Sequence, residues 1–359
     1  MTPYAKLASR LRAQLFAGTF LRHAYAGILG REPDAEGFAH YRAQLKAGCY
    51  TMKDVLAEIL NSSEYKQYFQ AQPDVEPVGL LRSEAEAVFN RFPRHQHGER
   101  GYVHDFLGVK TSVDVLDALS ELDGTVEDHP IPGNFHGQTN EWVGALSAAL
   151  ETATQFTVVE LGAGWAPWCA IGCVAAAKKG ATRRHARAVE GDRGHVAMID
   201  AHFDRNGIGR DERDVRLGIV GPDDGYAHFP QAQDARSDYG GAAVFETDAA
   251  DGESLPCYSL VTLLADLDTV DLLHCDIQGA ELDTLRAAMP TLARKVKWLI
   301  VGTHSLAIDR GLVGLFAGHG WTPQSLAPCT LRDGPDGPIL IADGTQVWRN
   351  DAQFPRPGA

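Results

Sequence analysis

A glutamate and two glycines that could hold a small ligand follow directly after a short apolar segment. Glu160, Gly162 and Gly164 come after the β-branched run 157–159, and an Ala-rich segment with Pro167 in its first turn comes next. This pattern predicts a strand, a tight turn and a helix. Because the first N–H groups of a helix have no partner inside the helix, we expect the turn to aim free N–H groups at a ligand lying over the strand end.

Two cofactors fit such a turn, and a glycine turn without any ligand is a third interpretation. A dinucleotide would place its pyrophosphate here and needs a third glycine, which residues 165–168 lack, and Glu160 would repel it. S-adenosylmethionine instead offers an ammonium and a sulfonium group, which a carboxylate attracts, and a carboxylate for the helix N-terminus. The turn therefore favours this methyl donor. Its expected contacts here are Glu160, Gly162, Gly164 and Trp165.

A second strand, predicted at residues 185–190, also ends in carboxylates. Glu190 ends the strand and Asp192 follows it. A carboxylate at this position can accept hydrogen bonds from both ribose hydroxyls of an adenosine, in either cofactor. We therefore expect Glu190 and Asp192 to bind the cofactor. A third strand is predicted at 214–220, and we expect the loop after it to reach the adenine.

Reactive side chains gather at the end of the fourth and fifth predicted strands. Asp276 ends the fourth strand, Gln278 and Glu281 follow in its turn, and the fifth strand delivers His304. Asp276 and Gln278 are also expected to contact the cofactor. Open α/β sheets hold their reacting groups at this edge. His304 titrates near neutrality and is the preferred general base, while Asp276 either orients it or is the base itself. The structural alternative is a histidine that only caps a strand end.

The elements that position these residues alternate between strand and helix from residue 156 onward, within an expected catalytic domain of residues 151–359. Such alternation predicts a mainly parallel sheet covered on both faces. Residues 221–257 show little periodicity and are expected to form an insertion or substrate loop. Residues 339–348 read as a β-hairpin that turns at Asp343-Gly344 and adds antiparallel strands to the sheet, whereas a dehydrogenase sheet would normally continue parallel.

The sequence before the first strand divides into two parts. Residues 1–72 show helical periodicity throughout, and the polar, proline-containing segment 72–77 is the expected linker. Residues 73–150 are expected to form a linker and a helical cap. Its helices are predicted at 80–89, 113–122 and 141–150. The breaker-rich loop 129–138 either folds over the active site as part of a lid or is a surface connection.

Composition limits the possible partners. The chain has 359 residues, a net charge of −14 and 44% hydrophobic residues, typical of a globular protein with more than one domain. The negative charge argues against nucleic acid and anionic membranes as partners, and favours a neutral or cationic substrate or a sugar. With no apolar run near 18 residues and no signal-peptide core, we expect a cytoplasmic protein without membrane insertion. The six scattered cysteines are expected to be buried free thiols.

The strand-end motifs resemble those of a known family in order and spacing. The four blocks 160–164, 189–192, 273–281 and 301–305 are similar to signature blocks of the FkbM-type S-adenosylmethionine-dependent methyltransferases, and the resemblance covers residues 140–350. It implies a class I, Rossmann-like fold and O-methylation, commonly of sugar hydroxyls in glycans or glycosylated natural products. Gln278 replaces a family glutamate and Gly302 replaces an acidic residue. Because both changes remove negative charge, we expect no metal at this edge.

The segment 29–65 resembles a small helical module of unassigned function found in bacterial proteins. It carries no catalytic pattern, so we expect residues 1–72 to dock a partner or to form a homo-oligomer, unless they only cover apolar surface. Three functions remain open from the sequence. The leading one is an S-adenosylmethionine-dependent O-methyltransferase acting on a small-molecule or glycan hydroxyl. The alternatives are an NAD-dependent oxidoreductase and a non-catalytic, methyltransferase-like binding protein.

Overall fold

We describe the fold from a computed structural model. It describes residues 33–47, 49–50, 75–76, 80–245, 252–334 and 337–356, together with the single positions 21, 25, 55 and 58. The chain divides into two compact units, residues 1–75 and 76–359. In the first unit the described helix is α2 (Ala35–Ala47), and the other helices expected in residues 1–72 lie outside the described residues. No helix in the described part of the chain has the length and apolar character needed to cross a membrane.

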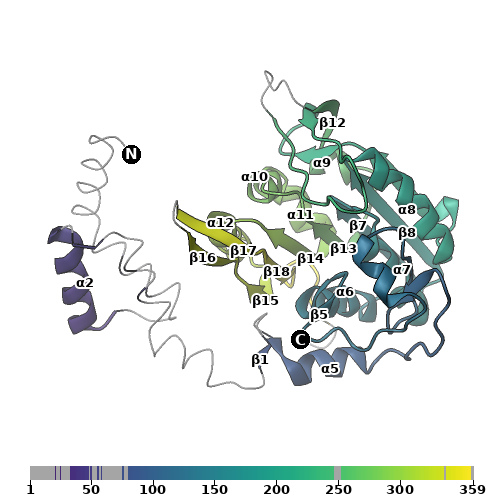
Figure 1. The fold of residues 1–359 in the computed structure, drawn as a ribbon, viewed down its shortest axis with the longest axis horizontal. Helices are drawn as coiled ribbons and strands as arrows, with labels where there is room; N and C mark the ends of the chain where they lie inside the picture. The colour runs from purple at the N-terminus through teal and green to yellow at the C-terminus, as the bar shows by residue number, and fades with distance from the viewer. Residues whose placement is uncertain are drawn as a thin grey trace. The chain divides into compact units, whose positions relative to one another are not determined.

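The second unit is built on a seven-stranded sheet in the order β15-β18-β14-β13-β7-β8-β9 (Figure 1). The parallel strands are β14 (Val296–Thr303), β13 (Val270–Cys275), β7 (Gln155–Leu161), β8 (Arg183–Glu190) and β9 (Arg213–Leu217). At one end β18 (Gly344–Arg349) runs antiparallel to both β14 and β15 (Thr322–Ala327). The predicted mostly parallel sheet with an antiparallel end is thus confirmed.

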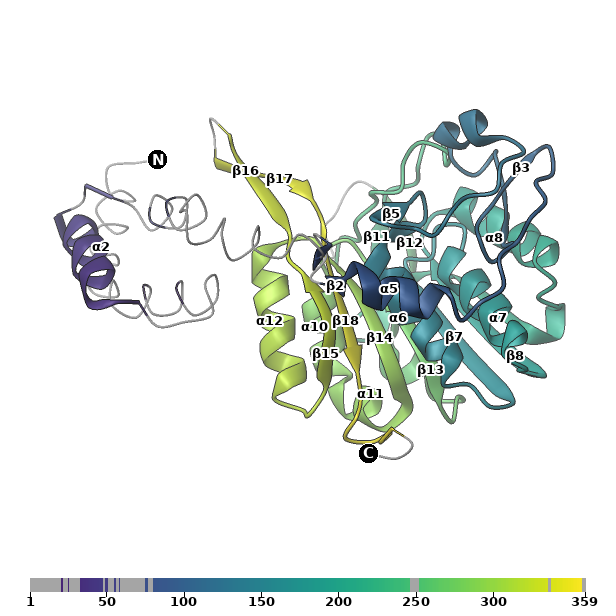
Figure 2. The same ribbon diagram turned by 90° about the horizontal axis from the view of Figure 1, so that it is seen from below.

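Helices cover both faces of this sheet (Figure 2). One face carries α5 (Arg82–Phe89), α6 (Thr139–Leu150), α7 (Pro167–Lys178) and α8 (Arg193–Arg205), and the other carries α9 (Leu260–Leu263), α10 (Glu281–Ala287), α11 (Met289–Lys295) and α12 (Leu306–Ala317). Along β7, Val158 belongs to the first core and Val159 to the second, because successive side chains of a strand point to opposite faces. The same alternation places Glu160 on the α7 face.

The cap region, residues 80–150, contains short elements that lie between α5 and α6 in the sequence. These are β3 (Tyr102–His104), β4 (Lys110–Ser112), the 3-10 helix η1 (Asp117–Leu122), β5 (Gly133–Asn134) and β6 (Gly137–Gln138). The helices predicted at 80–89 and 141–150 correspond to α5 and α6, whereas the third, at 113–122, is reduced to η1. Before them, β1 (Val75–Glu76) pairs with β2 (Leu80–Leu81).

The C-terminal hairpin turns at a different place from the one predicted. β16 (Thr330–Gly334) pairs with β17 (Gly337–Ala342), and their last partners are Gly334 and Gly337. Asp343 only connects β17 to β18, so the expected hairpin at 339–348 with an Asp343-Gly344 turn is wrong. A sequence of Gly-Pro-Asp-Gly at 334–337 is the stronger turn signal. As a result, β15–β16 and β17–β18 form the two arms of one long hairpin.

The stretch expected to be an irregular insertion contains a second, small sheet. β10 (Ile219–Gly221) pairs parallel with β12 (Glu253–Ser259), and β12 pairs antiparallel with β11 (Gly225–Phe229). The predicted third strand at 214–220 is therefore divided between β9 in the main sheet and β10 in the small one. This sheet lies next to the carboxyl ends of the central strands, where it contributes to two cavities.

Candidate active site

The glycine turn after β7 crosses closely over the end of β13. Gly162 has a φ of +69°, and a Cβ atom built there would lie 1.8 Å from the carbonyl oxygen of Asp276. Gly164 has a φ of +54°, and a Cβ atom there would lie 3.3 Å from the Tyr239 ring. Both positions therefore need glycine, one for close backbone approach and the other for a left-handed conformation that lets an aromatic ring pack above it.

The N–H groups of this turn already have partners, which differs from the expectation of free donors. Gly162 and Ala163 both donate to the carbonyl of Val189, and Gly164 donates to Glu190 Oε2 at 2.8 Å. The two carboxylate oxygens of Glu160 accept from Trp168 N at 3.2 Å and Cys169 N at 2.7 Å, in the first turn of α7. The first N–H groups of α7, which have no partner inside the helix, therefore donate to Glu160 and not to a ligand.

Glu160 is 1% exposed at the base of this turn. Burial raises its pKa to about 7, although His274 and the two N–H groups lower it in part. Because Glu160 is almost fully buried and both of its oxygens already accept backbone hydrogen bonds, it acts on a ligand mainly through its charge. A cation bound above it would stabilise the ionised form.

A pocket of about 320 Å³ opens above the turn. Its wall holds Glu160, Gly162, Gly164, Trp165, Glu190, Asp192, Asp276 and Gln278. The structure thus brings together every predicted cofactor residue. His304 is the exception among the predicted site residues, because it reaches the pocket only through Asp276.

Glu190 and Asp192 line the pocket at the end of β8. Glu190 accepts from Asp192 N at 2.7 Å in addition to Gly164 N. Asp192 caps α8 by accepting from Gly194 N and His195 N, and its other oxygen accepts from Ala232 N at 2.7 Å. Asp192 therefore fixes the start of α8 and the following loop, while Glu190 presents its carboxylate to the pocket wall.

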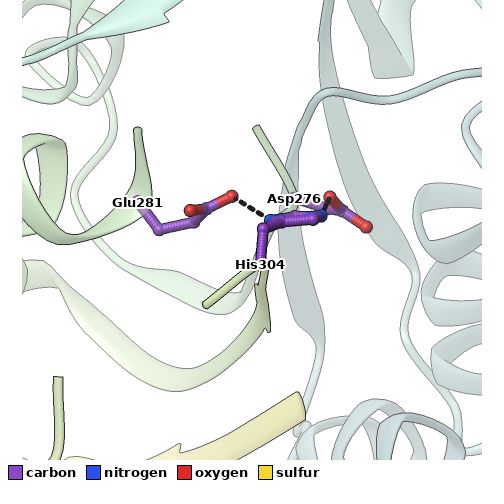
Figure 3. Close-up of side chains that lie close together, drawn as sticks. All are labelled: Asp276, Glu281 and His304. Carbon is purple, nitrogen blue, oxygen red and sulfur yellow. Dashed lines mark hydrogen bonds and ion pairs between the residues drawn. The ribbon is translucent and has the colours of Figure 1, made fainter. Parts of the chain in front are cut away.

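His304 follows β14 and lies between Asp276, at the end of β13, and Glu281, at the start of α10 (Figure 3). Its Nδ1 lies 2.9 Å from Glu281 Oε1, and its Nε2 lies 3.2 Å from Asp276 Oδ1. Glu281 is fully buried and also accepts from the backbone N–H groups of Ile277 and Gly279. The Asp276 side chain is 38% exposed, so Asp276 is the member of this group that a ligand can touch.

The charges of this group decide which residue can accept a proton. Burial alone would lower the pKa of His304, but Asp276 and Glu281 outweigh it and raise the pKa to about 10. Burial alone would raise the pKa of Asp276, but the ion pair with His304 outweighs it and lowers the pKa. At neutral pH His304 is an imidazolium and Asp276 a carboxylate. Because an imidazolium has no free nitrogen to accept a proton, these pKa shifts favour Asp276, the other base that the sequence allowed, and the choice between the two stays a prediction.

Gln278 and Gly302 both lie against the Asp276 side chain. Gln278 adopts a φ of +52° and donates from Nε2 to Asp276 Oδ1 at 3.2 Å. A Cβ atom at Gly302 would lie 3.0 Å from Asp276 Cγ, so a larger side chain there would displace the Asp276 carboxylate. Both departures from the family pattern thus act on Asp276.

The same three residues have the ligand types of a divalent cation site. One ligand atom from each of Asp276, Glu281 and His304 lies within 4.8 Å of the others. However, the imidazolium between the two carboxylates already supplies the compensating positive charge. The expectation that no metal binds here stays a prediction.

The pocket floor contains a second charged group that the sequence analysis missed. His274 in β13 lies beside Glu160 in the neighbouring strand, and its Nε2 lies 3.3 Å from Glu141 Oε1. Trp168 stacks on the His274 ring at 5.3 Å between centroids. Burial would lower the pKa of His274, but Glu141 and Glu160 outweigh it and raise the pKa. Its position two residues before Asp276, on the same face of the strand, was the available signal.

Two loops also contribute to the pocket. His136, from the breaker-rich loop 129–138, is buried in the pocket wall, and neither of its ring nitrogens has a hydrogen-bond partner among the described residues. Burial keeps its pKa well below the usual value, so it is neutral. Tyr239, from the loop after β11, stacks on His195 at 4.2 Å and meets Trp165 edge-on at 5.1 Å.

The pocket's chemistry fits the expected methyl donor. Buried polar atoms usually have partners, yet His136 and Trp165 Nε1 find none in the described protein and both line the pocket. The glycine turn leaves space above it, and the carboxylates of Glu160, Glu190 and Asp276 suit a ligand with an ammonium, a sulfonium and a ribose. The residues present therefore match the chemical groups of S-adenosylmethionine.

Comparisons with known proteins agree with this geometry. The model of the methyltransferase FkbM domain matches residues 174–312, and residues 5–69 match a domain of unknown function, DUF4214. A protein of Jannaschia sp. (strain CCS1) named "Putative methyltransferase" is 31% identical over 267 residues, which cover 72% of this chain and 95% of that protein.

Solved structures with a similar arrangement include two methyltransferases. Precorrin-6y C5,15-methyltransferase from Geobacter metallireducens covers 59% of this chain and 87% of its own, with a TM-score of 0.35 and 11% identity. Ribosomal protein L11 methylase from Lactobacillus delbrueckii subsp. bulgaricus covers 63% and 84%, with a TM-score of 0.32 and 16% identity. We draw no functional argument from these low scores. The family model and the 31% identical relative carry the assignment, and the chain belongs to the FkbM-type methyltransferases.

Proposed function

We propose that this methyltransferase uses S-adenosylmethionine and methylates a hydroxyl group on a sugar of a glycan or glycosylated metabolite. The observation that carries the proposal is the contact between the glycine turn and the end of β13. Gly162 packs against the backbone of Asp276, so a donor held by the turn has its reactive end beside the one exposed carboxylate of the His304 group.

The proposed cofactor contacts are divided among three strand ends. S-adenosylmethionine, when bound, would supply a methyl group on a sulfonium, which an in-line nucleophile takes as the carbon–sulfur bond breaks and the thioether S-adenosylhomocysteine leaves. Glu190 accepts hydrogen bonds from the ribose hydroxyls, as the carboxylate at the end of β8. Glu160 and His274 set the charge below the methionine end, and the residues at 218–220, which line the pocket after β9, lie toward the adenine.

Asp276 takes the proton of the acceptor hydroxyl in this proposal. As the hydroxyl oxygen forms its bond to the methyl carbon, its proton becomes far more acidic than a carboxylic acid, so even a carboxylate with a lowered pKa can accept it. His304 stays protonated and holds Asp276 in place, and buried Glu281 holds His304. Asp276 is thus the catalytic base, and His304 and Glu281 are positioning residues.

The acceptor and the cellular setting are proposed on charge and composition. A net charge of −14 disfavours nucleic acid, and an uncharged sugar suits it better. Residues 1–72 are proposed to dock a protein partner or a second copy of the chain. The six cysteines are free thiols, which supports a reducing compartment such as the cytoplasm.

Donor binding can be tested by thermal unfolding. We expect millimolar S-adenosylmethionine to raise the melting temperature of the full chain, and Glu190→Ala to abolish the shift, because loss of two charged hydrogen bonds weakens binding about 100-fold. Glu212→Ala is the matched control: this carboxylate pairs with Arg184 at the opposite end of β8 and should keep the shift. No shift for the wild type would contradict the proposal.

The absence of a metal requirement can be tested with a chelator. We expect methyl transfer to continue at an undiminished rate in EDTA, because the imidazolium of His304 lies between the two carboxylates, where a cation would bind, and balances one of their two negative charges. The measurement is the rate of S-adenosylhomocysteine formation before and after dialysis. A loss of rate that Mg²⁺ or Mn²⁺ restores would show instead that Asp276, Glu281 and His304 bind a cation.

A further inference from the structure

A second cavity, of about 590 Å³, lies beside the pocket already described. The two share Ala243, Ile277 and Gln278 in their walls. Because Ile277 and Gln278 directly follow Asp276, a molecule in the second cavity has one end beside the proposed base. The cavity therefore lies where the body of a methyl acceptor has to be.

Two exposed aromatic side chains line this cavity. Tyr226 in β11 is 76% exposed, more than any other large apolar or aromatic side chain of the described residues, and Phe245 is 42% exposed. Burial of such side chains stabilises a fold, and the protein forgoes much of this stabilisation at Tyr226 and part of it at Phe245. Aromatic rings left in water at a concave site indicate a ligand that covers them.

The remaining polar groups of the cavity are acidic or neutral. Asp223, Asp224 and Asp283 belong to its wall, and among the described residues that line it there is no lysine, arginine or histidine. Asp224 is held in place, because its two oxygens accept from Ser259 N at 2.7 Å and Thr262 Oγ1 at 2.6 Å. Asp283 is paired with Arg286, but no cation of the described residues forms an ion pair with Asp223 or Asp224, so an anionic ligand would meet repulsion on that part of the wall.

We propose that this second cavity is the acceptor subsite and binds a pyranose ring that carries no negative charge. The C–H groups of a pyranose are polarised by the neighbouring oxygens and pack on the negative face of an aromatic ring, here Tyr226. Its hydroxyls donate to carboxylates such as Asp223 and to the side-chain oxygen of Gln278. The phosphates of a nucleotide-activated sugar would face three carboxylates, so the acceptor is a finished glycoside. Glycosyl transfer then has to precede methylation.

This inference rests on the proposed function, since it places the acceptor relative to Asp276. It can be tested by saturation-transfer NMR on the full chain in the presence of S-adenosylhomocysteine. The probes are the methyl pyranosides of glucose, galactose, mannose and N-acetylglucosamine, with glucose 6-phosphate as the anionic probe. The proteins are the wild type, Tyr226→Ala, Tyr226→Phe and Val261→Ala, the last being a truncation of another exposed side chain, in α9.

We expect at least one methyl pyranoside, but not glucose 6-phosphate, to receive saturation from the wild type. Tyr226→Ala should weaken that binding about tenfold, while Tyr226→Phe, which keeps the ring, and Val261→Ala should retain it. Binding of no pyranoside, equal binding by Tyr226→Ala, or preference for glucose 6-phosphate would each overturn the inference.

Donor binding, measured on the same proteins, separates this inference from the proposed function. Tyr226→Ala should keep the thermal shift with S-adenosylmethionine, because Tyr226 does not line the donor pocket. Pyranoside binding without any donor shift in the wild type would refute the donor proposal and leave the sugar subsite standing. A thermal shift with S-adenosylmethionine but no binding of a pyranoside would refute the sugar subsite and leave the donor proposal standing.

Discussion

Replacing Asp276 by asparagine is expected to lower kcat about 1,000-fold and to weaken S-adenosylmethionine binding far less, because Glu160 and Glu190 keep their charge in the pocket wall. Removing a general base typically costs two to four orders of magnitude in rate. The asparagine keeps the shape of the side chain but can neither accept the proton nor balance the imidazolium of His304. The measurement is the single-turnover rate with saturating donor, and thermal unfolding reports donor binding.

The pH dependence distinguishes a base from a structural carboxylate. His304 lowers the pKa of Asp276, so the active carboxylate form persists down to acidic pH and is lost only as the pH falls through that lowered pKa. His304→Gln removes the ion pair, so the acid limb of the rate should move to higher pH. Asp204→Asn, which changes an exposed carboxylate paired with Arg213, is the control and should leave kcat and its pH profile unchanged. A full rate for Asp276→Asn would exclude Asp276 as the base.

Replacing Gly162 by alanine is expected to lower the free energy of unfolding by at least about 3 kcal/mol. The left-handed conformation alone costs an alanine about 1–2 kcal/mol. In addition, the new Cβ would lie 1.8 Å from the Asp276 carbonyl oxygen, a backbone atom that can move only if the adjacent strands β7 and β13 separate. Overlap with backbone is among the changes that give unusually large losses of stability.

Gly207 provides a matched control for this substitution. It has nearly the same φ, +67°, and a Cβ atom there would meet nothing within 4 Å. Gly207→Ala should therefore lose only the conformational part, about 1–2 kcal/mol. Urea unfolding of the two variants measures the difference between them. Equal losses would show that the approach of the turn to β13 is not tight.

Much of the fold followed from local patterns in the chain. Short β-branched runs such as 157–159 alternate with helical segments, and this alternation alone requires a doubly covered parallel sheet. Parallel strands in such a sheet end at one edge, so carboxylates at strand ends, like Glu160, Glu190 and Asp276, had to come near one another. For this reason the residues that line the pocket were predictable. The groups that hydrogen-bond to them were not, because these come from other segments of the chain.

The C-terminal hairpin and the small sheet were harder to predict. At 339–348 an Asp-Gly pair between two apolar runs looked like the turn, but pairing across the whole hairpin placed it at 334–337 instead. The strands β11 and β12 are far apart in sequence and pair only across the intervening loop. Strand pairing over such separations depends on tertiary contacts that no short window of sequence contains.

What the sequence by itself determined is the set of chemical groups at the strand ends: the glycine turn, the ribose carboxylate candidate Glu190, and the pair Asp276 and His304. The tertiary structure alone decided their states. It placed His304 between Asp276 and buried Glu281, which turns the preferred base into a cation. It also brought Tyr226 beside the turn that follows Asp276. Protonation and substrate contacts depend on distances between residues remote in the chain, and these distances exist only once the chain has folded.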